Sequence, residues 1–450
     1  MKENPVNTVG RVFLRPMARQ SEYQRLIHEM YNLRRFGIKL ELTTMQRMLD
    51  ALGRPHTRYE TIHIAGTNGK GSIATTLATI LHAAGYRTGL YTSPHLVTFN
   101  ERIQINNRPV SNAAVVRACK AVRGLSGDGR EPTFFEYTTA MAFYLFAELG
   151  VDIAVIETGM GGRFDATNII TPCLSVISNI SVEHRMYLGN TLGEIAGEKA
   201  GIIKPGVPVV TGARQKPVLD VIKKVAKKQA APLYRLGGEF RVRRHGDGTF
   251  SYHGISHRWD RLRTVLAGGF QMDNAALALA GCELLMASGK PLSEATVRKG
   301  LASTRWPARL EIVSDSPTIL IDGAHNLQAA KNLAAFLSEQ MAGRKITLVA
   351  GILDDKPYRA MLRALVPLCD RVILTRAQIG RAIAPEILER EARNLGATRT
   401  HVVDRVDKAL AFALAHTPKK SGAVCVAGSL YVAGEARHAI KKQGEMQPAI

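Results

Sequence analysis

Residues 61–84 join an apolar strand to a helix through a glycine-rich turn. The strand reads Thr-Ile-His-Ile-Ala over 61–65, the turn reads Gly-Thr-Asn-Gly-Lys-Gly-Ser over 66–72, and a helical apolar pattern fills 73–84. A strand this apolar is typical of a parallel sheet that helices cover on both faces. The segment therefore predicts an α/β fold in which strands and helices alternate.

The same alternation continues along the chain. Short apolar runs predict four further strands, at Thr88–Thr92, Asp152–Glu157, Leu174–Asn179 and Pro208–Thr211. Helical patterns such as Thr138–Leu149 lie between them. Phe240–Ile255 differs, because two alternating stretches flank His-Gly-Asp-Gly at 245–248, a pattern that predicts a β-hairpin.

A second alternating block follows Arg-Trp-Pro at 305–307. Its predicted strands are Thr318–Ile321, Ile346–Ala350, Arg371–Leu374 and Ala423–Val426. At roughly 150 residues per domain, 450 residues correspond to two or three domains. We predict two: residues 1–303 with a mostly parallel sheet, and residues 304–450 as a smaller Rossmann-like α/β domain.

The turn at 66–72 has the composition of a loop that holds nucleotide phosphates. Glycines let backbone N–H groups approach the phosphates, and the helix N-terminus adds a partial positive charge. Lys70 can reach the β- and γ-phosphates, and a neighbouring hydroxyl can help to position Mg²⁺. Ile64 stands where the general pattern has a glycine, so this loop is a shortened variant. The predicted nucleotide-binding residues here are Gly66, Thr67, Asn68, Gly69, Lys70, Gly71 and Ser72.

The chain is strongly basic. It has 60 Lys and Arg against 38 Asp and Glu, a formal net charge of +22. Such an excess is typical of proteins that bind nucleic acid, an anionic membrane surface or a polyanionic small substrate, and a solvated basic surface explains it equally well. Aromatic residues make up only 6% of the chain, which speaks against a base-stacking surface.

The sequence shows no signal for export or membrane insertion. Charged residues occur throughout the first 24 positions, and no apolar run reaches the ~18 residues that a membrane span needs. The five cysteines are scattered and form no Cys-x-x-Cys pair. We therefore expect a cytoplasmic protein with reduced thiols.

Further motifs follow the phosphate loop in a fixed order. They are Tyr-Thr-Ser-Pro-His-Leu at 91–96, Phe-Asn-Glu-Arg-Ile-Gln-Ile-Asn at 99–106, Glu-Thr-Gly-Met-Gly-Gly-Arg-Phe-Asp-Ala-Thr-Asn at 157–168, Glu-Lys-Ala-Gly-Ile at 198–202, Trp-Pro-Ala-Arg-Leu-Glu at 306–311, Asp-Gly-Ala-His-Asn at 322–326 and Gly-Ser-Leu-Tyr-Val-Ala-Gly-Glu-Ala-Arg at 428–437. Over residues 34–437, the chain resembles the folylpolyglutamate synthase/dihydrofolate synthase family of the Mur ligase superfamily. This resemblance implies a Mur-ligase-type P-loop ATPase domain followed by a glutamate ligase domain.

The resemblance also implies ATP-dependent amide formation. A pteroate or folate carboxylate would attack the γ-phosphate of ATP to give an acyl phosphate, and the amine of L-glutamate would then displace phosphate. The expected partners are dihydropteroate or a reduced folate, L-glutamate and ATP, with no nucleic acid and no membrane, and we expect a monomer. A Mur-type ligase for another carboxylate and a nucleic-acid-dependent NTPase are the alternatives.

Four positions match residues that bind Mg²⁺ in the family. Ser93, Glu157 and His184 each follow an apolar strand, at the edge where open α/β sheets bind ligands. Lys199 matches a lysine that the family carbamylates, and the carbamate would bind a second Mg²⁺. An ion pair with Glu194 or Glu198 is the alternative for Lys199. The predicted catalytic residues are Lys70, His184, Lys199 and Arg309.

The remaining site residues also follow from the resemblance. Asn274, Arg309 and Asp322 match nucleotide contacts, and His325 is expected near the incoming glutamate or as a helix cap. The pterin side maps onto Thr133, Phe135, Phe164, Asp165 and Ala166. Core packing is the alternative for both phenylalanines.

The chain departs from the family pattern at three positions. Glu183 replaces an aspartate, Ala308 replaces a glycine, and Phe270 replaces a histidine. These changes leave open which folate form is accepted. The sequence also leaves open whether one activity or both are present, and how long a glutamate chain is built.

Overall fold

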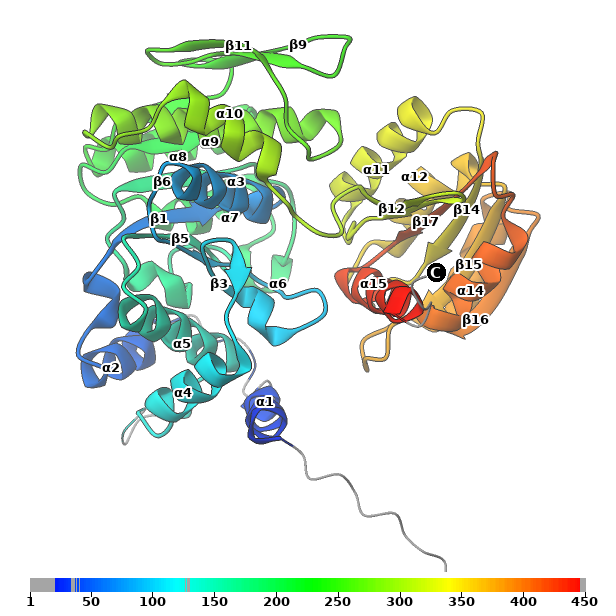
Figure 1. Cartoon of the computed structure of the whole chain (residues 1–450), viewed down its shortest axis with the longest axis horizontal. Coiled ribbons are helices and arrows are strands. Elements are labelled where there is room, and N and C mark those ends of the chain that lie inside the picture. The colour runs from blue at the N-terminus through cyan, green and yellow to red at the C-terminus, as the bar shows by residue number, and fades with distance from the viewer. Residues whose placement is uncertain are drawn as a thin grey trace, which may run out of the picture.

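The structure is a computed structural model that describes residues 21–33, 37, 39, 41–125, 127 and 130–445. Two α/β units lie side by side, the larger built from the N-terminal part of the chain and the smaller from the C-terminal part (Figure 1). The predicted fold class is confirmed, because the main sheet of each unit is mostly parallel.

An eight-stranded sheet forms the centre of the larger unit within the described residues, in the order β4-β3-β2-β5-β1-β6-β7-β8. The strands are β1 (Glu60–Ala65), β2 (Thr88–Tyr91), β3 (Ile103–Ile105), β4 (Arg108–Pro109), β5 (Ile153–Glu157), β6 (Leu174–Ile177), β7 (Val209–Thr211) and β8 (Leu233–Arg235). Only β3 and β4 join antiparallel. Ile62 of β1 pairs with Val155 of β5 and Leu174 of β6, so β1 is central.

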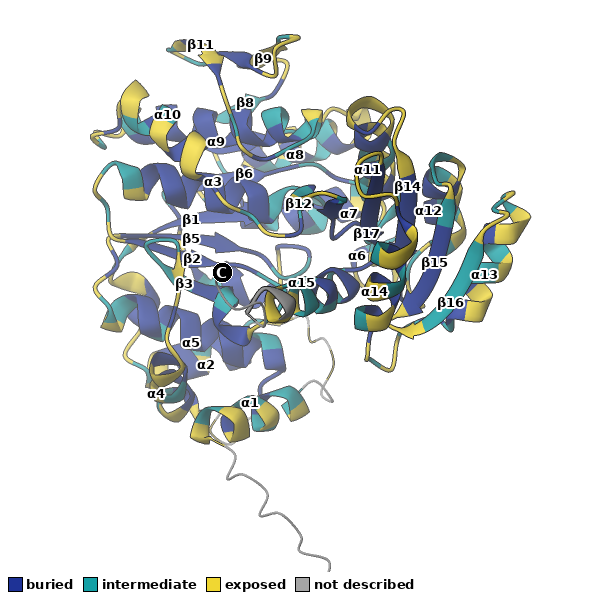
Figure 2. Cartoon of the chain, turned by 45° about the vertical axis from the view of Figure 1, so that its right-hand side comes forward, coloured by how far each residue is buried: buried dark blue, intermediate teal, exposed yellow. Residues whose placement is uncertain are grey.

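Helices cover both faces of this sheet and leave its central strands buried (Figure 2). One face packs against α3 (Lys70–Ala83), α9 (Gly269–Ala287) and α10 (Glu294–Ser303). The other packs against α1 (Glu22–Asn32), α2 (Thr43–Ala51), α4 (Asn112–Val122) and α5 (Phe134–Glu148). Around β7 lie α6 (Arg185–Leu188), α7 (Leu192–Lys199) and α8 (Lys216–Lys228). Because α3 lies between the sheet and two other helices, it is apolar on nearly all sides.

A small antiparallel sheet lies outside α9, in the order β11-β10-β9. It contains β9 (Arg241–Arg244), β10 (Phe250–His253) and β11 (Arg258–Leu262). The hairpin predicted over Phe240–Ile255 is confirmed as β9 and β10. Glu283 of α9 holds this sheet, because its carboxylate accepts hydrogen bonds from the Tyr252 hydroxyl and three backbone N–H groups.

The smaller unit contains a six-stranded sheet in the order β12-β13-β17-β14-β15-β16. Its strands are β12 (Glu311–Asp315), β13 (Thr318–Ile321), β14 (Lys345–Ala350), β15 (Arg371–Arg376), β16 (Thr400–Arg405) and β17 (Gly422–Ala427). One face packs against α11 (Leu327–Gln340), α12 (Tyr358–Leu365) and α13 (Pro385–Asn394). The other packs against α14 (Val406–His416) and α15 (Leu430–Glu445).

The structure differs from the predicted elements mainly at the edge strands of the sheets and at the start of one helix. The predictions did not include β8, β12 or β16, which are edge strands with few fully buried residues. Helix α3 begins at Lys70, three residues before the apolar pattern, because its first turn is polar and faces a cavity. The domain boundary between residues 303 and 304 stays a prediction, and α10 ends at Ser303. None of the described helices is long and apolar enough to cross a membrane.

His63 lies in the middle of β1 and is fully buried. Its Nε2 lies 2.8 Å from the Thr167 hydroxyl, and burial lowers the pKa of His63 to about 3. The unfolded chain has an ordinary histidine pKa of about 6.5, so below that pH it binds more protons than the folded chain. The stability of the folded state therefore falls as the pH falls below about 6.5.

We predict that His63 accounts for about 2 kcal/mol of the stability lost between pH 7 and pH 5. His63→Gln keeps a hydrogen-bonding side chain but cannot titrate, so this variant should lose correspondingly less stability. Urea unfolding at the two pH values measures the difference. His28→Gln, at an exposed position of α1, is the control and should behave like the parent protein. Equal losses in parent and His63→Gln would contradict the prediction.

Candidate active site

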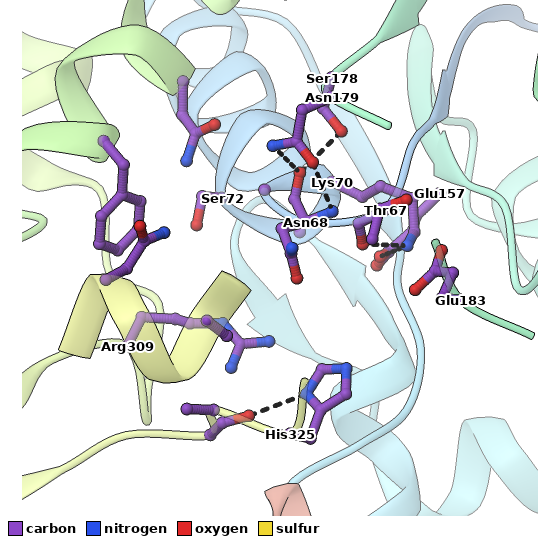
Figure 3. A pocket seen from close by; sticks show the side chains of 18 of the residues that line it. Thr67, Asn68, Lys70, Ser72, Glu157, Ser178, Asn179, Glu183, Arg309 and His325 are labelled. Carbon is purple, nitrogen blue, oxygen red and sulfur yellow. Dashed lines mark hydrogen bonds and ion pairs between the residues drawn. The ribbon is translucent and has the colours of Figure 1, made fainter. Parts of the chain in front are cut away.

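A cavity of about 280 Å³ lies where the two units meet. Its lining comes from the loops after β1, β2, β5 and β6, from α9, and from the turns beside β13 (Figure 3). These loops follow the carboxyl ends of neighbouring parallel strands, where α/β sheets bind ligands. The topology therefore brings residues from both units to one site.

The phosphate loop connects β1 to α3, as predicted. Gly69 has φ +89°, and a Cβ there would collide with the Asn274 side-chain oxygen. The Lys70 ammonium donates to the carbonyls of Gly66 (3.1 Å) and Thr67 (3.3 Å). It also lies 4.0 Å from a Glu157 carboxylate oxygen. The Lys70 side chain thus folds back onto the loop and also lines the cavity.

Two residues after β6 hold the loop from the side. The Asn68 carbonyl accepts hydrogen bonds from the Ser178 hydroxyl (2.7 Å) and the Asn179 amide (3.0 Å), and the Asn68 N–H donates to the Asn179 side chain (3.1 Å). The sequence predictions did not include Ser178 and Asn179. Their position just after an apolar strand, like that of Ser93, is the signal that would have found them.

Ser93, Glu157 and His184 line the same cavity, so the structure brings these predicted metal ligands together. The Ser93 N–H donates to a Glu157 carboxylate oxygen at 3.2 Å. Burial raises the pKa of Glu157, although the Lys70 ammonium acts in the opposite direction. Burial also lowers the pKa of His184, which favours a neutral imidazole. The described residues contain no group of three His, Cys, Asp or Glu side chains placed around one metal position.

Lys199 is buried and its ammonium reaches the base of the phosphate loop. It donates to the Gly66 carbonyl and to a Glu183 carboxylate oxygen, both at 2.9 Å. The alternative partners Glu194 and Glu198 are therefore wrong, because Lys199 points into the protein. Burial lowers the pKa of Lys199, and the nearby Lys70 charge acts in the same direction. Burial opposes the charged form of Glu183, but attraction to Lys199 and Lys70 outweighs it and holds the pKa of Glu183 at about 2.

The smaller unit contributes Arg309, Asp322 and His325 to the cavity. The two oxygens of Asp322 accept hydrogen bonds from the backbone N–H groups of Leu310 (2.9 Å) and Ala324 (2.8 Å). Asp322 therefore holds the turn that carries Arg309. The His325 Nδ1 donates to the Gly323 carbonyl at 2.9 Å, so a neutral ring keeps its lone pair on Nε2. Burial lowers the pKa of His325 to about 4.

The structure excludes a helix-capping role for His325 and identifies Asn326 as a site residue that the sequence predictions did not include. The cap of α11 is Asn326, whose side chain accepts from the Ala329 N–H, so His325 is not the cap. The Asn326 amide also donates to the Asn68 side chain at 2.8 Å. This contact joins the phosphate loop to the smaller unit. An Asn immediately before a helix is the signal that sequence reasoning could have used.

Asn274 also lines the cavity, as do the apolar residues Phe270, Leu236 and Leu333. Its amide donates to Gln271 at 2.9 Å. Of the predicted nucleotide-binding residues, only Gly66 does not line the cavity, because its carbonyl accepts from Lys70 and Lys199 beneath the loop.

None of the five residues predicted for the pterin lines this cavity, but Phe135 and Asp165 contact the lining residues Gly159 and Met160. Thr133 caps α5, and Phe135 stacks on Tyr91 and packs against Gly159, which does line the cavity. Asp165 accepts from the Met160 and Thr167 N–H groups and the Thr167 hydroxyl, and Ala166 is buried beside it. Phe164 is 42% exposed, which excludes core packing for this residue.

Comparisons with known proteins agree with this geometry. Residues 64–282 match the Mur ligase middle domain, and residues 308–430 match the glutamate ligase domain of Mur ligases. A folylpolyglutamate synthase from Lacticaseibacillus casei is 37% identical over 92% of this chain and 97% of its own length. A dihydrofolate synthase/folylpolyglutamate synthase from Bacillus subtilis is 40% identical over 74% of this chain and 80% of its own length.

A solved structure shares the whole arrangement. Escherichia coli FolC in complex with DHPP and ADP superposes with a TM-score of 0.86 at 31% identity, covering 93% of this chain and 98% of that chain. Both sequence and fold thus match over nearly the full length. The chain belongs to the folylpolyglutamate synthase/dihydrofolate synthase family of Mur ligases.

Proposed function

We propose that this chain is an ATP-dependent ligase that adds L-glutamate to dihydropteroate, to reduced folates, or to both, and releases ADP and phosphate. The observation that carries the proposal is the cavity between the units, where the cations Lys70 and Arg309 lie with the buried carboxylate Glu157. The names of the relatives from L. casei and B. subtilis, and the DHPP and ADP bound to the E. coli protein, support it. These relatives do not favour the two alternatives, a Mur-type ligase for another carboxylate and a nucleic-acid-dependent NTPase.

The reaction needs two steps because a carboxylate has no good leaving group. In the first, a carboxylate oxygen of the pteroyl substrate bonds to the γ-phosphorus and the bond to ADP breaks. In the second, the glutamate amine bonds to the acyl carbon, loses a proton, and phosphate leaves. Lys70 and Arg309 stabilise negative charge on the transferred phosphoryl group. His325 presents a neutral Nε2 that can accept the proton of the amine.

The donor set of the cavity fits Mg²⁺, a hard cation that prefers oxygen ligands. A buried Glu157 carboxylate, the Ser93 hydroxyl and a neutral His184 all line this cavity, as does Arg309. We assign these three residues to a first Mg²⁺ site. Bound there, the ion would draw charge from the phosphate oxygens of ATP.

Carbamylation of Lys199 fits the same cavity only together with a cation. A carbamate would stand next to the Glu183 carboxylate, which now lies 2.9 Å from the ammonium. Two anions at that distance repel each other unless a positive ion lies between them. Carbamylated Lys199 and Glu183 therefore imply a second Mg²⁺ beside the phosphate loop.

Two further observations bear on the cellular location and the assembly state. All five cysteines are free thiols, as in proteins of a reducing compartment. We accordingly place the enzyme in the cytoplasm. The cavity is complete within one chain, with residues from both units, which supports a monomer as the functional unit.

We predict that the protein releases ADP when dihydropteroate or tetrahydrofolate is supplied together with L-glutamate and Mg²⁺-ATP. Lys70→Ala should reduce this release at least a hundredfold, because an oriented charge on the phosphates is lost. Lys223→Ala, on the exposed side of α8, is the matched control and should keep full activity. No ADP release with either pteroyl substrate, or near-normal turnover of Lys70→Ala, would contradict the proposal.

Glu157→Gln should raise the Mg²⁺ concentration for half-maximal activity at least tenfold. Glutamine keeps the shape of the side chain and can still accept from the Ser93 N–H, but it has no charge. Because burial disfavours the charged form of Glu157, the variant should fold as stably as the parent. Asp354→Asn, at an exposed carboxylate, is the control. An unchanged Mg²⁺ titration would remove Glu157 from the metal site.

A carbamate on Lys199 should become more abundant as the pH rises. Only the neutral amine reacts with CO₂, and burial, which lowers the pKa of Lys199, increases the neutral fraction. With ¹³C-bicarbonate and Mg²⁺, we expect a carbamate carbon resonance that is strong at pH 8.5, weak at pH 6.5, and absent in Lys199→Gln. Lys204→Gln is the control, since burial also lowers the pKa of Lys204. A resonance that survives in Lys199→Gln, or none in the parent, would contradict the assignment.

A further inference from the structure

A second cavity, of about 380 Å³, adjoins the first. The two share six lining residues: Gly71, Ser93, Pro94, Glu157, Arg309 and Leu430. Among these are the residues assigned to phosphoryl transfer. The second cavity therefore opens directly onto the reacting centre. From there it extends along the loop after β2 to the outer surface of α15, where Lys441 is exposed.

The walls of this second cavity carry positive charge that the protein does not neutralise. Arg305 and Lys441 are exposed, and neither has a carboxylate partner among the described residues. Within the described part of the chain, the Arg305 guanidinium donates only to the carbonyls of Ala302 and Thr304 at the end of α10. Arg437 differs, because Glu311 pairs with it at 3.1 Å.

The two carboxylates in the lining pair with groups other than Arg305 and Lys441. Glu101 accepts hydrogen bonds from the backbone N–H groups at 96–98, so its oxygens are already used within the loop. Glu157 lies at the reacting centre, next to Lys70. The outer part of the cavity thus presents Arg305 and Lys441 to any ligand that carries several negative charges.

One wall is flat and apolar. The Trp306 ring lies against the phosphate loop, where a Cβ on Gly71 would collide with it, and Pro307 and Leu96 continue the surface. A ligand that suits this cavity therefore combines an aromatic group with a row of carboxylates. Such a ligand must also place one carboxylate next to Glu157 and Arg309.

We propose that the second cavity holds the oligo-γ-glutamyl part of a pteroyl substrate during chain elongation, with its α-carboxylates facing Arg305 and Lys441. This inference rests on the function proposed above and assigns the preference for longer substrates to two cations of this cavity. Each γ-linked residue adds one negative charge, whereas dihydropteroate has no α-carboxylate and gains nothing from these cations. The incoming L-glutamate is a separate ligand, which meets His325 in the first cavity.

The test compares substrates of different chain length. In the double variant Arg305→Ala/Lys441→Ala, the ratio of kcat/KM for tetrahydropteroyl-triglutamate to kcat/KM for dihydropteroate should fall roughly fivefold to tenfold, as expected for two solvent-exposed ion pairs. The change should lie in KM, and kcat should stay the same. It should shrink at high salt, because salt screens such pairs.

Lys442→Ala is the matched control, since Lys442 is the neighbouring exposed lysine on α15 and lines neither cavity. It should leave the ratio unchanged. An unchanged ratio in the double variant would overturn the proposal. So would a rise in KM for free L-glutamate with no dependence on chain length, because the cations would then serve the amino acid. Failure of the parent protein to release ADP with any pteroyl substrate is a different result, which would overturn the proposed function itself.

Discussion

The carbonyl oxygen of Gly66 accepts hydrogen bonds from two lysine ammonium groups, those of Lys70 and Lys199. One lysine belongs to the phosphate loop, and the other ends a helix more than a hundred residues later. This shared acceptor fixes the loop against α7 and sets the distance between the phosphates and the candidate metal site. Lys199 remains buried there because Glu183 balances its charge, and an unpaired ammonium at this depth would be strongly unfavourable.

The sequence predicted the site best where all the residues of a functional motif are adjacent in the chain. The phosphate loop, the strand before it and the helix after it form one continuous segment, so their geometry follows from local rules. Ser93, Glu157 and His184 were also predictable, because each follows an apolar strand of one parallel sheet, and such strands end at the same edge. Their arrangement around one cavity required only that rule.

The rest depended on contacts that no local pattern contains. Asn179 and Asn326 reach the same Asn68 from different units, and only the finished topology brings them together. The pairing of Lys199 with Glu183 was missed for the same reason, since the partners considered for it, Glu194 and Glu198, are its neighbours in the same helical segment. Edge strands such as β16 lack a continuous apolar run, because one side of each faces solvent. Their sequences therefore resemble loops.

Ala308, which replaces a glycine of the family pattern, shows how neighbouring contacts stabilise an unfavourable backbone conformation. Ala308 has φ +54°, a left-handed conformation that costs an alanine roughly 1 kcal/mol relative to glycine. Its N–H donates to Glu311, its carbonyl accepts from Gly323, and its methyl group is fully buried. These contacts hold the turn in the conformation that places Arg309 in the lining of the cavity.

The amide contact between Asn68 and Asn326 has a consequence for turnover. It consists of two hydrogen bonds, at 2.8 and 3.5 Å, each worth about 1 kcal/mol at most in net terms. A link this weak breaks and reforms on the timescale of domain motions. Because Asn68 belongs to the phosphate loop, the link between the two units holds only while that loop keeps its shape. The shape of the phosphate loop and the position of the smaller unit are thus coupled through a single pair of side chains.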